Sequence, residues 1–326
     1  MDVIGIDIGG TKTSVCVADH TGTVLAQQRI VSGGDATLAG YEKRLATLLQ
    51  RVIEKSGLAG EDIAAAGISA PGPLRVADGM LLAPPNNPGW FDVPIVSMVR
   101  KMIHHPVFMN NDANAGVLAE KMFGTYHDCE NMIYLTFSTG MGGGIIAAGR
   151  LVQGMTDMGG EVGHQILDAA GLPCPCGLRG CFEVYCGGRN VELRLRETLA
   201  SDPSIETLLR ERCEGDLERL DHAMFAAAVR DGDPFAMAQW DAFIERLAQG
   251  IGNLIMILNP EVILLGTIAL HEGDLVLNPL REKLPRYAWS WPLQACRIET
   301  TTLGKRLGDL AAVAVALDGL AARDAG

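Results

Sequence analysis

The sequence predicts an α/β fold made of two related halves. Short segments rich in β-branched residues alternate with amphipathic segments, and a strand–glycine turn–strand pattern at residues 3–18 returns at residues 132–148. Strand–helix–strand order is typical of α/β proteins, and a returning pattern indicates structurally related units. Of the 326 residues, 48% are hydrophobic, so the chain is long enough to form two domains with full cores.

The first half is predicted to begin with a β-meander and to continue with alternating helices and strands. Glycine pairs and Thr-Gly turns separate the first strands, and apolar residues at helical spacing followed by Gly57 predict the first helix. The predicted elements are the strands Val3–Asp7, Thr13–Ala18 and Val24–Arg29, the helix Leu38–Ser56, the strands Ile63–Ser69 and Val107–Met109, and the helix Ala113–Phe123.

The second half is predicted to restart the same order and then to become mainly helical. Periodicity and composition are the evidence for each element. The predicted elements are the strand Met132–Ser138, a glycine turn over Thr139–Gly144, the strand Gly144–Ala148, a mainly helical region over residues 190–250, the buried strand Val262–Leu265 and the closing helix Leu310–Ala322.

Charge and hydropathy argue against several classes of function. The formal net charge of -12 would repel a polyphosphate backbone, so nucleic-acid binding is not expected. The N-terminal segment lacks the basic and apolar regions of a secretory signal, and no apolar run approaches the ~18–20 residues of a spanning helix. We therefore expect a cytoplasmic protein with no nucleic-acid or membrane partner.

Two glycine-rich turns are candidate phosphate sites. They are DIGGTKT at Asp7–Thr13 and STGMGGG at Ser138–Gly144. Glycine has no Cβ, so backbone N–H groups can approach an anion closely; Asp7 can hold hydrated Mg²⁺, and Thr139 can donate its hydroxyl to a phosphate oxygen. Neither turn has the Walker pattern. An ordinary hairpin turn is the alternative interpretation of the first.

A third candidate is Asp112 in the segment NNDANA, between a predicted strand and a predicted helix. Helix N-terminal amides stabilise a carboxylate as the anion. A phosphoryl-transfer enzyme uses such a group to accept the proton of the attacking hydroxyl. Asp is also a common helix N-cap, so a purely structural role is the alternative.

A fourth candidate is a metal site with the spacing His-x₉-Cys-x-Cys-x₄-Cys, formed by His164, Cys174, Cys176 and Cys181. Three thiolates and one imidazole make a closed tetrahedral Zn²⁺ site with no open position, which is structural rather than hydrolytic. Clustered cysteines in an intracellular chain favour a metal over disulfides. Three free buried cysteines are the alternative.

Two glutamates flank this predicted metal site. Glu161 precedes His164 by three residues, and Glu183 follows Cys181 by two. Carboxylates held rigidly beside a metal site can accept hydrogen bonds from sugar hydroxyls. Ordinary surface solvation is the alternative for either glutamate.

Taken together, these motifs resemble the ROK family of repressors and sugar kinases, within the actin-like ATPase superfamily. The resemblance covers almost the whole chain, through the segments DIGGTKT, APGP, PNNPGW, NNDANA, STGMGGG, GGEVGH and CPCGLRGCFE. It implies an α/β fold of the two-lobed actin-like ATPase (ribonuclease H-like) type, with the active site in the interlobe cleft and a structural zinc loop. The small lobe would cover residues 1–117 and the final helix 309–326, and the large lobe residues 118–308.

The resemblance also implies a function and a role for each motif residue. The chain would phosphorylate a free hexose with ATP, using Mg²⁺ and structural Zn²⁺, and would form a homodimer. Asp112 matches the catalytic base. The implied sugar ligands are Asn86, Asn111, Glu161, His164 and Glu183. The implied nucleotide residues are Asp7, Gly9, Gly10, Thr11, Lys12, Thr139, Gly140 and Gly266. His164 also matches a zinc ligand, together with Cys174, Cys176 and Cys181.

The sequence departs from the family at one loop. Where the family commonly has a run of glycines after a strand, this chain reads Leu265-Gly266-Thr267-Ile268-Ala269, so only Gly266 is kept. Because the first predicted strand begins at Val3, we expect no DNA-reading helix before it. Glucose is the first expected substrate. N-acetylmannosamine, N-acetylglucosamine, allose, mannose and fructose are alternatives, as are a non-catalytic sugar sensor and an ATPase of the chaperone or actin type.

Overall fold

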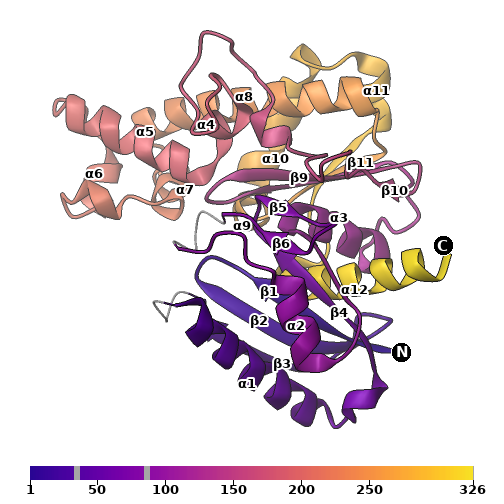
Figure 1. Ribbon diagram of the computed structural model, residues 1–326. Coiled ribbons are helices and arrows are strands. Elements are labelled where there is room, and N and C mark those ends of the chain that lie inside the picture. Colours follow the sequence, from indigo (N-terminus) through magenta and orange to yellow (C-terminus); the bar gives the residue numbers. More distant parts are fainter. Residues whose placement is uncertain (33–36, 84–88, 326) are drawn as a thin grey trace. The chain divides into compact units, whose positions relative to one another are not determined.

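The computed structural model describes residues 1–32, 37–83 and 89–325, which form two compact units (Figure 1). Unit 1 comprises residues 1–129, 151–159 and 302–326, and unit 2 comprises residues 130–150 and 160–301. The lobe boundaries at 117 and 309 stay a prediction. Within unit 1, the buried carboxylate of Glu120 accepts hydrogen bonds from the backbone N–H groups of Thr302 (2.8 Å) and Leu303 (3.2 Å), which joins segments far apart in the chain.

Unit 1 is built on a five-stranded sheet in the order β3-β2-β1-β4-β7. The pairs β1–β2 and β2–β3 are antiparallel, and β1–β4 and β4–β7 are parallel. Its elements are β1 (Asp2–Ile8), β2 (Lys12–Asp19), β3 (Val24–Val31), α1 (Leu38–Ser56), η1 (Gly60–Asp62), β4 (Ile63–Ala70), β5 (Leu74–Arg75), β6 (Met80–Leu81), α2 (Ile95–Ile103), β7 (Val107–Asn111), α3 (Asp112–Phe123), η5 (Gly304–Arg306) and α12 (Leu307–Ala325).

Helices cover both faces of this sheet (Figure 1). Side chains alternate along a strand, so Ile4 and Ile6 pack against α1 and α2 while Val3 packs on the opposite face against α12. The close approach of α12 depends on Gly67 in β4, because a Cβ there would lie 2.1 Å from the carbonyl oxygen of Ala312. This packing holds the first turn of α12 near the end of β1.

Unit 2 is built on a second sheet in the order β10-β9-β8-β11-β12. The pair β8–β9 is antiparallel, and β8–β11 and β11–β12 are parallel. Its elements are β8 (Met132–Phe137), β9 (Met141–Ala147), β10 (Arg150–Leu151, at the unit boundary), η2 (Val162–His164), α4 (Phe182–Cys186), α5 (Gly188–Ser201), α6 (Leu208–Arg212), η3 (Leu217–Arg219), α7 (His222–Arg230), α8 (Pro234–Leu258), β11 (Val262–Leu265), α9 (Ile268–Glu272), α10 (Asp274–Lys283), η4 (Leu284–Arg286), α11 (Ser290–Ala295) and β12 (Arg297–Thr300).

The two sheets share one topology, as the repeated sequence pattern predicted. In each, the central strand (β1 or β8) pairs antiparallel with the next strand in the chain and parallel with a later one. A glycine-rich turn joins the antiparallel pair in both units. The α/β class and the relation between the halves are therefore confirmed.

One prediction about the second glycine segment was wrong. The turn was expected to extend to Gly144, but β9 already begins at Met141, and Gly142 to Gly144 pair with Thr136 to Tyr134 of β8. Gly143 is needed for packing rather than for turning, because a Cβ there would lie 2.6 Å from a methyl group of Val162. The turn itself is Ser138–Gly140.

No helix in the described part of the chain is both long enough and apolar enough to span a bilayer.

Candidate active site

The first glycine turn, Gly9–Thr11, joins β1 to β2 in unit 1. Gly9 donates its backbone N–H to the carbonyl of Lys12 at 2.9 Å, and the carbonyl of Thr11 accepts from Ser32 at 2.9 Å. The backbone N–H groups of Gly10 and Thr11 donate to no residue within the described ranges. The turn is thus closed by its own bonds and keeps two donors for an anion.

Asp7 lies at the carboxyl edge of the unit 1 sheet, in register with two polar residues. Strand pairing sets Asp7 beside Ser69 of β4, and Ser69 beside Asn110 of β7. Burial raises the pKa of Asp7 to about 7, with further contributions from the carboxylates of Asp112 and Asp309, against a lowering by the Ser69 hydroxyl. A carboxyl group in this environment favours a cation, because the cation would offset its desolvation and the neighbouring negative charge.

Asp112 is the first residue of α3, directly after β7. The N-cap is Asn111, whose side-chain oxygen accepts from the backbone N–H of Asn114 at 2.7 Å. The alternative in which Asp112 serves only as the cap is therefore not supported. Asp112 is exposed, and its charge acts on Asp7. The NH₂ group of Asn111 has no partner among the described residues, so it can donate to a ligand.

Three residues of this region were missed by sequence reasoning: Ser69, Gly308 and Asp309. A Cβ on Gly308 would lie 3.0 Å from Oδ2 of Asp7, so a glycine lets the first turn of α12 approach that carboxyl. Asp309 accepts from the hydroxyl of Ser14 at 2.7 Å and carries a negative charge toward Asp7. Of these three, only Ser69 could have been found from the sequence, because it lies at the end of a predicted strand.

The second glycine turn, Ser138–Gly140, occupies the equivalent place in unit 2. The start of α5 holds it, because Gly188 donates to the carbonyl of Ser138 at 2.6 Å and Arg189 donates to that of Thr139 at 3.2 Å. The backbone N–H groups of Thr139 and Gly140 have no acceptor among the described residues. This turn also presents two free donors.

Glu183 anchors the second glycine turn. Its Oε2 accepts a hydrogen bond from the backbone N–H of Met141 at 2.8 Å. A Cβ on Gly140 would lie 2.7 Å from the same oxygen, so a larger residue there would displace the Glu183 carboxylate. The resemblance implied a sugar ligand at Glu183; the structure gives one of its oxygens a partner within the protein.

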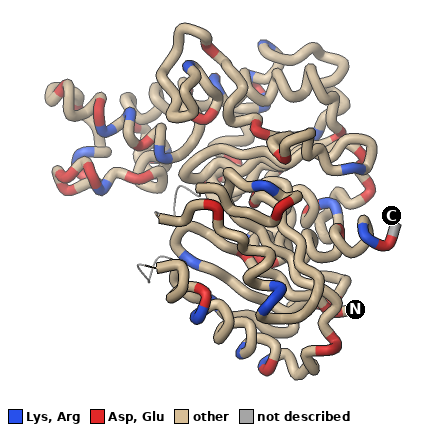
Figure 2. Tube along the Cα trace, viewed as in Figure 1, with Lys and Arg blue, Asp and Glu red and all other residues tan. Residues whose placement is uncertain are grey.

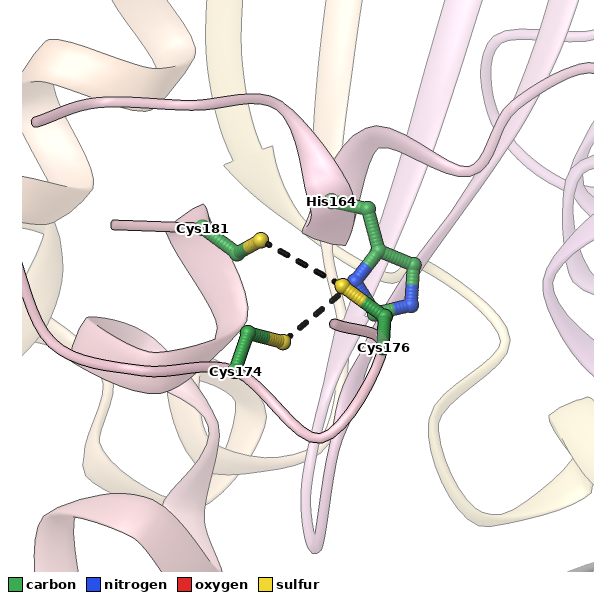
Figure 3. A group of neighbouring side chains, drawn as sticks. All are labelled: His164, Cys174, Cys176 and Cys181. Carbon is green, nitrogen blue, oxygen red and sulfur yellow. Dashed lines mark hydrogen bonds between the residues drawn. The ribbon is translucent and has the colours of Figure 1, made fainter. Parts of the chain in front are cut away.

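The predicted metal ligands lie together in the segment from His164 to Cys181, which we call the metal loop (Figure 3). The four donor atoms all lie within 4.8 Å of one another. Cys176 Sγ and Cys181 Sγ are 3.7 Å apart, and Cys174 Sγ is 3.8 Å from His164 Nδ1. A tetrahedral ion with Zn–S bonds of ~2.3 Å places two sulfurs ~3.8 Å apart, so the donor set and spacing fit structural Zn²⁺.

The orientation of His164 fits two roles at once. Its Nδ1 faces the sulfurs, while the other ring nitrogen points away from all three (Figure 3). Glu161 is exposed at the start of η2, and its side chain has no hydrogen-bond partner among the described residues. Both groups are therefore open to a ligand. Asn86, also implied as a sugar ligand, lies outside the described residues.

In the loop after β11, Thr267 has a backbone conformation that glycine usually adopts. Thr267 has φ 43° and ψ -98°, although its side chain is β-branched. Its hydroxyl lies 3.1 Å from that of Thr136. Gly266 is required sterically, since a Cβ there would lie 2.3 Å from the Tyr134 hydroxyl. A non-glycine residue in this region is strained, by about 1–3 kcal/mol.

The structure thus groups the candidate residues within each unit. Unit 1 brings Asp7 and Asp112 together beside the first glycine turn. Unit 2 joins the second glycine turn to Glu183, and the metal loop ends next to that glutamate.

Comparison with known proteins gives consistent findings. The model of the ROK family matches residues 3–318. The chain is 32% identical to a glucokinase of Thermotoga maritima over 287 residues, covering 88% of each chain. Its structure is similar to that of a ROK hexokinase from Thermus thermophilus (TM-score 0.83, 31% identity, 99% of this chain and 100% of the other). It is also similar to a ROK family glucokinase from Streptomyces griseus in complex with glucose and AMPPNP (TM-score 0.80, 28% identity, 98% of this chain and 100% of the other).

Proposed function

The chain belongs to the ROK family and has the actin-like α/β fold predicted for it, and from this premise we propose that it is an ATP-dependent hexose kinase. Glucose is the proposed first substrate. The Thermotoga maritima glucokinase and the glucose complex from Streptomyces griseus support this choice.

The observation that carries the proposal is that the carboxyl groups of Asp7 and Asp112 lie close enough in unit 1 for the charge of Asp112 to raise the pKa of Asp7. A kinase needs a carboxylate near the phosphates and a second one that accepts a proton from the substrate. Asp7 lies at the end of β1, just before the first glycine turn, and its pKa responds to the charge of Asp112. Asp112 itself is exposed at the start of α3. Two adjacent carboxyl groups with such different surroundings suit these two tasks.

We assign the chemical step to Asp112. Its carboxylate accepts the proton of the sugar hydroxyl, for which O6 is proposed, as that oxygen forms a bond to the γ-phosphorus of ATP. The bond from this phosphorus to the bridging oxygen breaks, and ADP leaves with the electron pair. Mg²⁺, held beside Asp7, would neutralise charge on the phosphates. The free N–H groups of the two glycine turns are suited to phosphate oxygens, and we assign Lys12 and Gly266 to the nucleotide as well.

We assign sugar recognition to Asn86, Asn111, Glu161, His164 and Glu183. The metal loop supports this assignment, because Zn²⁺ bound there would hold His164 and the flanking glutamates rigidly. We further propose that the protein is cytoplasmic and forms a homodimer.

The test is ADP release coupled to a reporter enzyme, measured with a panel of hexoses. The panel contains glucose, mannose, fructose, allose, N-acetylglucosamine and N-acetylmannosamine. Turnover that depends on a sugar, with the highest kcat/KM for glucose, is expected. Binding of sugar without ADP release would favour the sensor alternative. ADP release that no sugar stimulates would favour an ATPase of another type.

A further inference from the structure

Unit 1 contains a cavity that the proposed reaction does not use. It has a volume of about 730 Å³ and is lined by the last turn of α2, by the loop leading to β7 and by the end of α12. Pockets of this size suit small-molecule ligands. Lys101, Arg100, His104 and Arg323 contribute to its wall, and we call it the basic cavity.

The charge of the basic cavity is opposite to that of the chain as a whole. The chain carries a formal net charge of -12, yet the described lining includes no Asp or Glu. Figure 2 shows basic residues on α2 and again just before the C-terminus. A wall of one charge sign concentrates field lines in a concave site and attracts counter-ions.

Most of these side chains have no partner in the described part of the protein. The side chains of Arg100, Lys101 and His104 make no hydrogen bond or ion pair within the described ranges. Among the described residues, Arg323 pairs with its exposed neighbour Asp324, at 3.2 Å. His105 differs, because its Nε2 lies 2.9 Å from the carbonyl of Gly60 and so has a structural partner. Two cationic groups, Arg100 and Lys101, and the imidazole of His104 are therefore available to a ligand.

Part of the lining of the basic cavity is apolar. Pro106, Val107 and Phe108 line it beside the basic side chains. Apolar lining of this kind accommodates the carbon skeleton of an organic ligand.

The basic cavity is distinct from the proposed reaction centre. It includes Val107, the first residue of β7, whereas Asp112 follows the last residue of the same strand. At ~3.3 Å per residue, these two ends of β7 are about 13 Å apart. A ligand in the basic cavity would therefore leave Asp112 uncovered.

We propose that the basic cavity binds a phosphorylated small molecule through its phosphate group. Arg and Lys are the side chains that recognise phosphate, through charge-assisted hydrogen bonds. The phosphate can come from a sugar phosphate, from inorganic phosphate or from a short polyphosphate. This inference does not depend on the proposed kinase activity.

The alternative is that Arg100 and Lys101 only offset the negative end of the α2 dipole. A matched control exists, since Lys55 is an exposed basic residue in the last turn of α1 and lies outside the cavity. Lys55→Glu alters the same kind of helix end without touching the proposed site.

The experiment is calorimetric titration of the full chain with glucose 6-phosphate, inorganic phosphate and tripolyphosphate at constant ionic strength. The proteins are the wild type, Arg100→Glu/Lys101→Glu and Lys55→Glu. Binding at other sites is common to all three proteins, so a difference in affinity between them reports on the basic cavity. Besides any site common to all three proteins, we expect a class of site in the wild type and in Lys55→Glu whose affinity falls at least tenfold in the double variant. If the double variant does not fold, Arg323→Glu on α12 replaces it.

The probes distinguish the sources of phosphate. Tightest binding of glucose 6-phosphate assigns a sugar phosphate, tightest binding of tripolyphosphate assigns a polyphosphate, and equal binding assigns recognition of the phosphate group alone. The proposal is overturned if no probe binds the wild type, if the charge-reversed cavity binds as well as the wild type, or if Lys55→Glu weakens binding equally.

Discussion

Oε2 of Glu183 accepts a hydrogen bond from the backbone N–H of Met141 at 2.8 Å. Glu183 follows the last metal ligand, Cys181, by two residues, and Met141 directly follows the second glycine turn. Gly140 makes room for the same carboxylate, and Gly163 lets η2 approach β9, since a Cβ there would lie 2.2 Å from the carbonyl of Met141. The metal loop and the glycine turn therefore form one structural element.

Removing the carboxylate should loosen this element. A hydrogen bond to a charged group contributes about 1.5–3 kcal/mol, and we expect Glu183→Ala to lower the free energy of unfolding by that amount. Glu183→Gln keeps an acceptor oxygen, so it should cost about half as much. Urea denaturation measures both. If Glu183→Ala unfolds at the same urea concentration as the wild type, the contact does not stabilise the turn.

The metal loop should depend on its ion. Cys176→Ser removes one thiolate, so we expect zinc content and thermal stability to fall together, because metal binding contributes directly to folding. Elemental analysis and a thermal melt are the measurements. Cys296→Ser is the control, because Cys296 is buried outside the cluster. The Cys296→Ser protein should keep the zinc content of the wild type. Full stability in a metal-free Cys176→Ser protein would contradict a structural ion.

Asp7 should make stability fall as pH rises. Its pKa in the folded protein is about 7, above its ordinary value of 3.8, so the folded state holds a proton that the unfolded chain has released. The stabilising contribution is fully present below pH ~4 and is lost as pH rises through ~7. Asp7→Asn should therefore have a higher free energy of unfolding than the wild type at pH 8, by at most about 4 kcal/mol, and should match the wild type at pH 4.

The same variant should lose activity, because the amide is a poorer partner for Mg²⁺. Melting curves across pH without Mg²⁺ check the first statement, and turnover at saturating ATP checks the second. If the difference in stability between Asp7→Asn and the wild type is the same at pH 4 and pH 8, the pKa of the Asp7 carboxyl is not raised in the folded protein.

Thr267 should be a source of strain. Glycine adopts positive φ without steric cost, so Thr267→Gly is expected to raise stability by about 1 kcal/mol, less the entropy that glycine adds to the unfolded chain. Thr267→Ala removes the hydroxyl contact with Thr136 but keeps the strain, and should not stabilise. Chemical denaturation of both variants is the measurement. A destabilised Thr267→Gly protein would mean that the loop is not strained.

The elements with strong local signals were the most predictable from the sequence. The helix Leu38–Ser56 has the predicted bounds, because its apolar spacing, the Thr37 cap and Gly57 agree. The metal cluster was predictable for the same reason: its four ligands lie within eighteen positions of one another, and their chemistry is specific.

Long-range relationships were not predictable in this way. The groups that raise the pKa of Asp7 include Asp309, which lies in the first turn of α12, about 300 positions later in the chain. Gly143 of β9 was assigned to a turn because spacing alone does not show that Val162 packs against it. Sequence spacing predicts which residues share an element, whereas such contacts depend on how elements pack.

The most direct test of the account is the kcat of Asp112→Asn with its best hexose, measured beside hexose binding. General-base catalysis contributes about 10²–10⁴-fold, so kcat should fall at least ~100-fold while the sugar Kd stays near its wild-type value. Asp128→Asn, an exposed aspartate elsewhere in unit 1, should keep its activity. Near-normal turnover in Asp112→Asn would contradict the assignment of this carboxylate as the base.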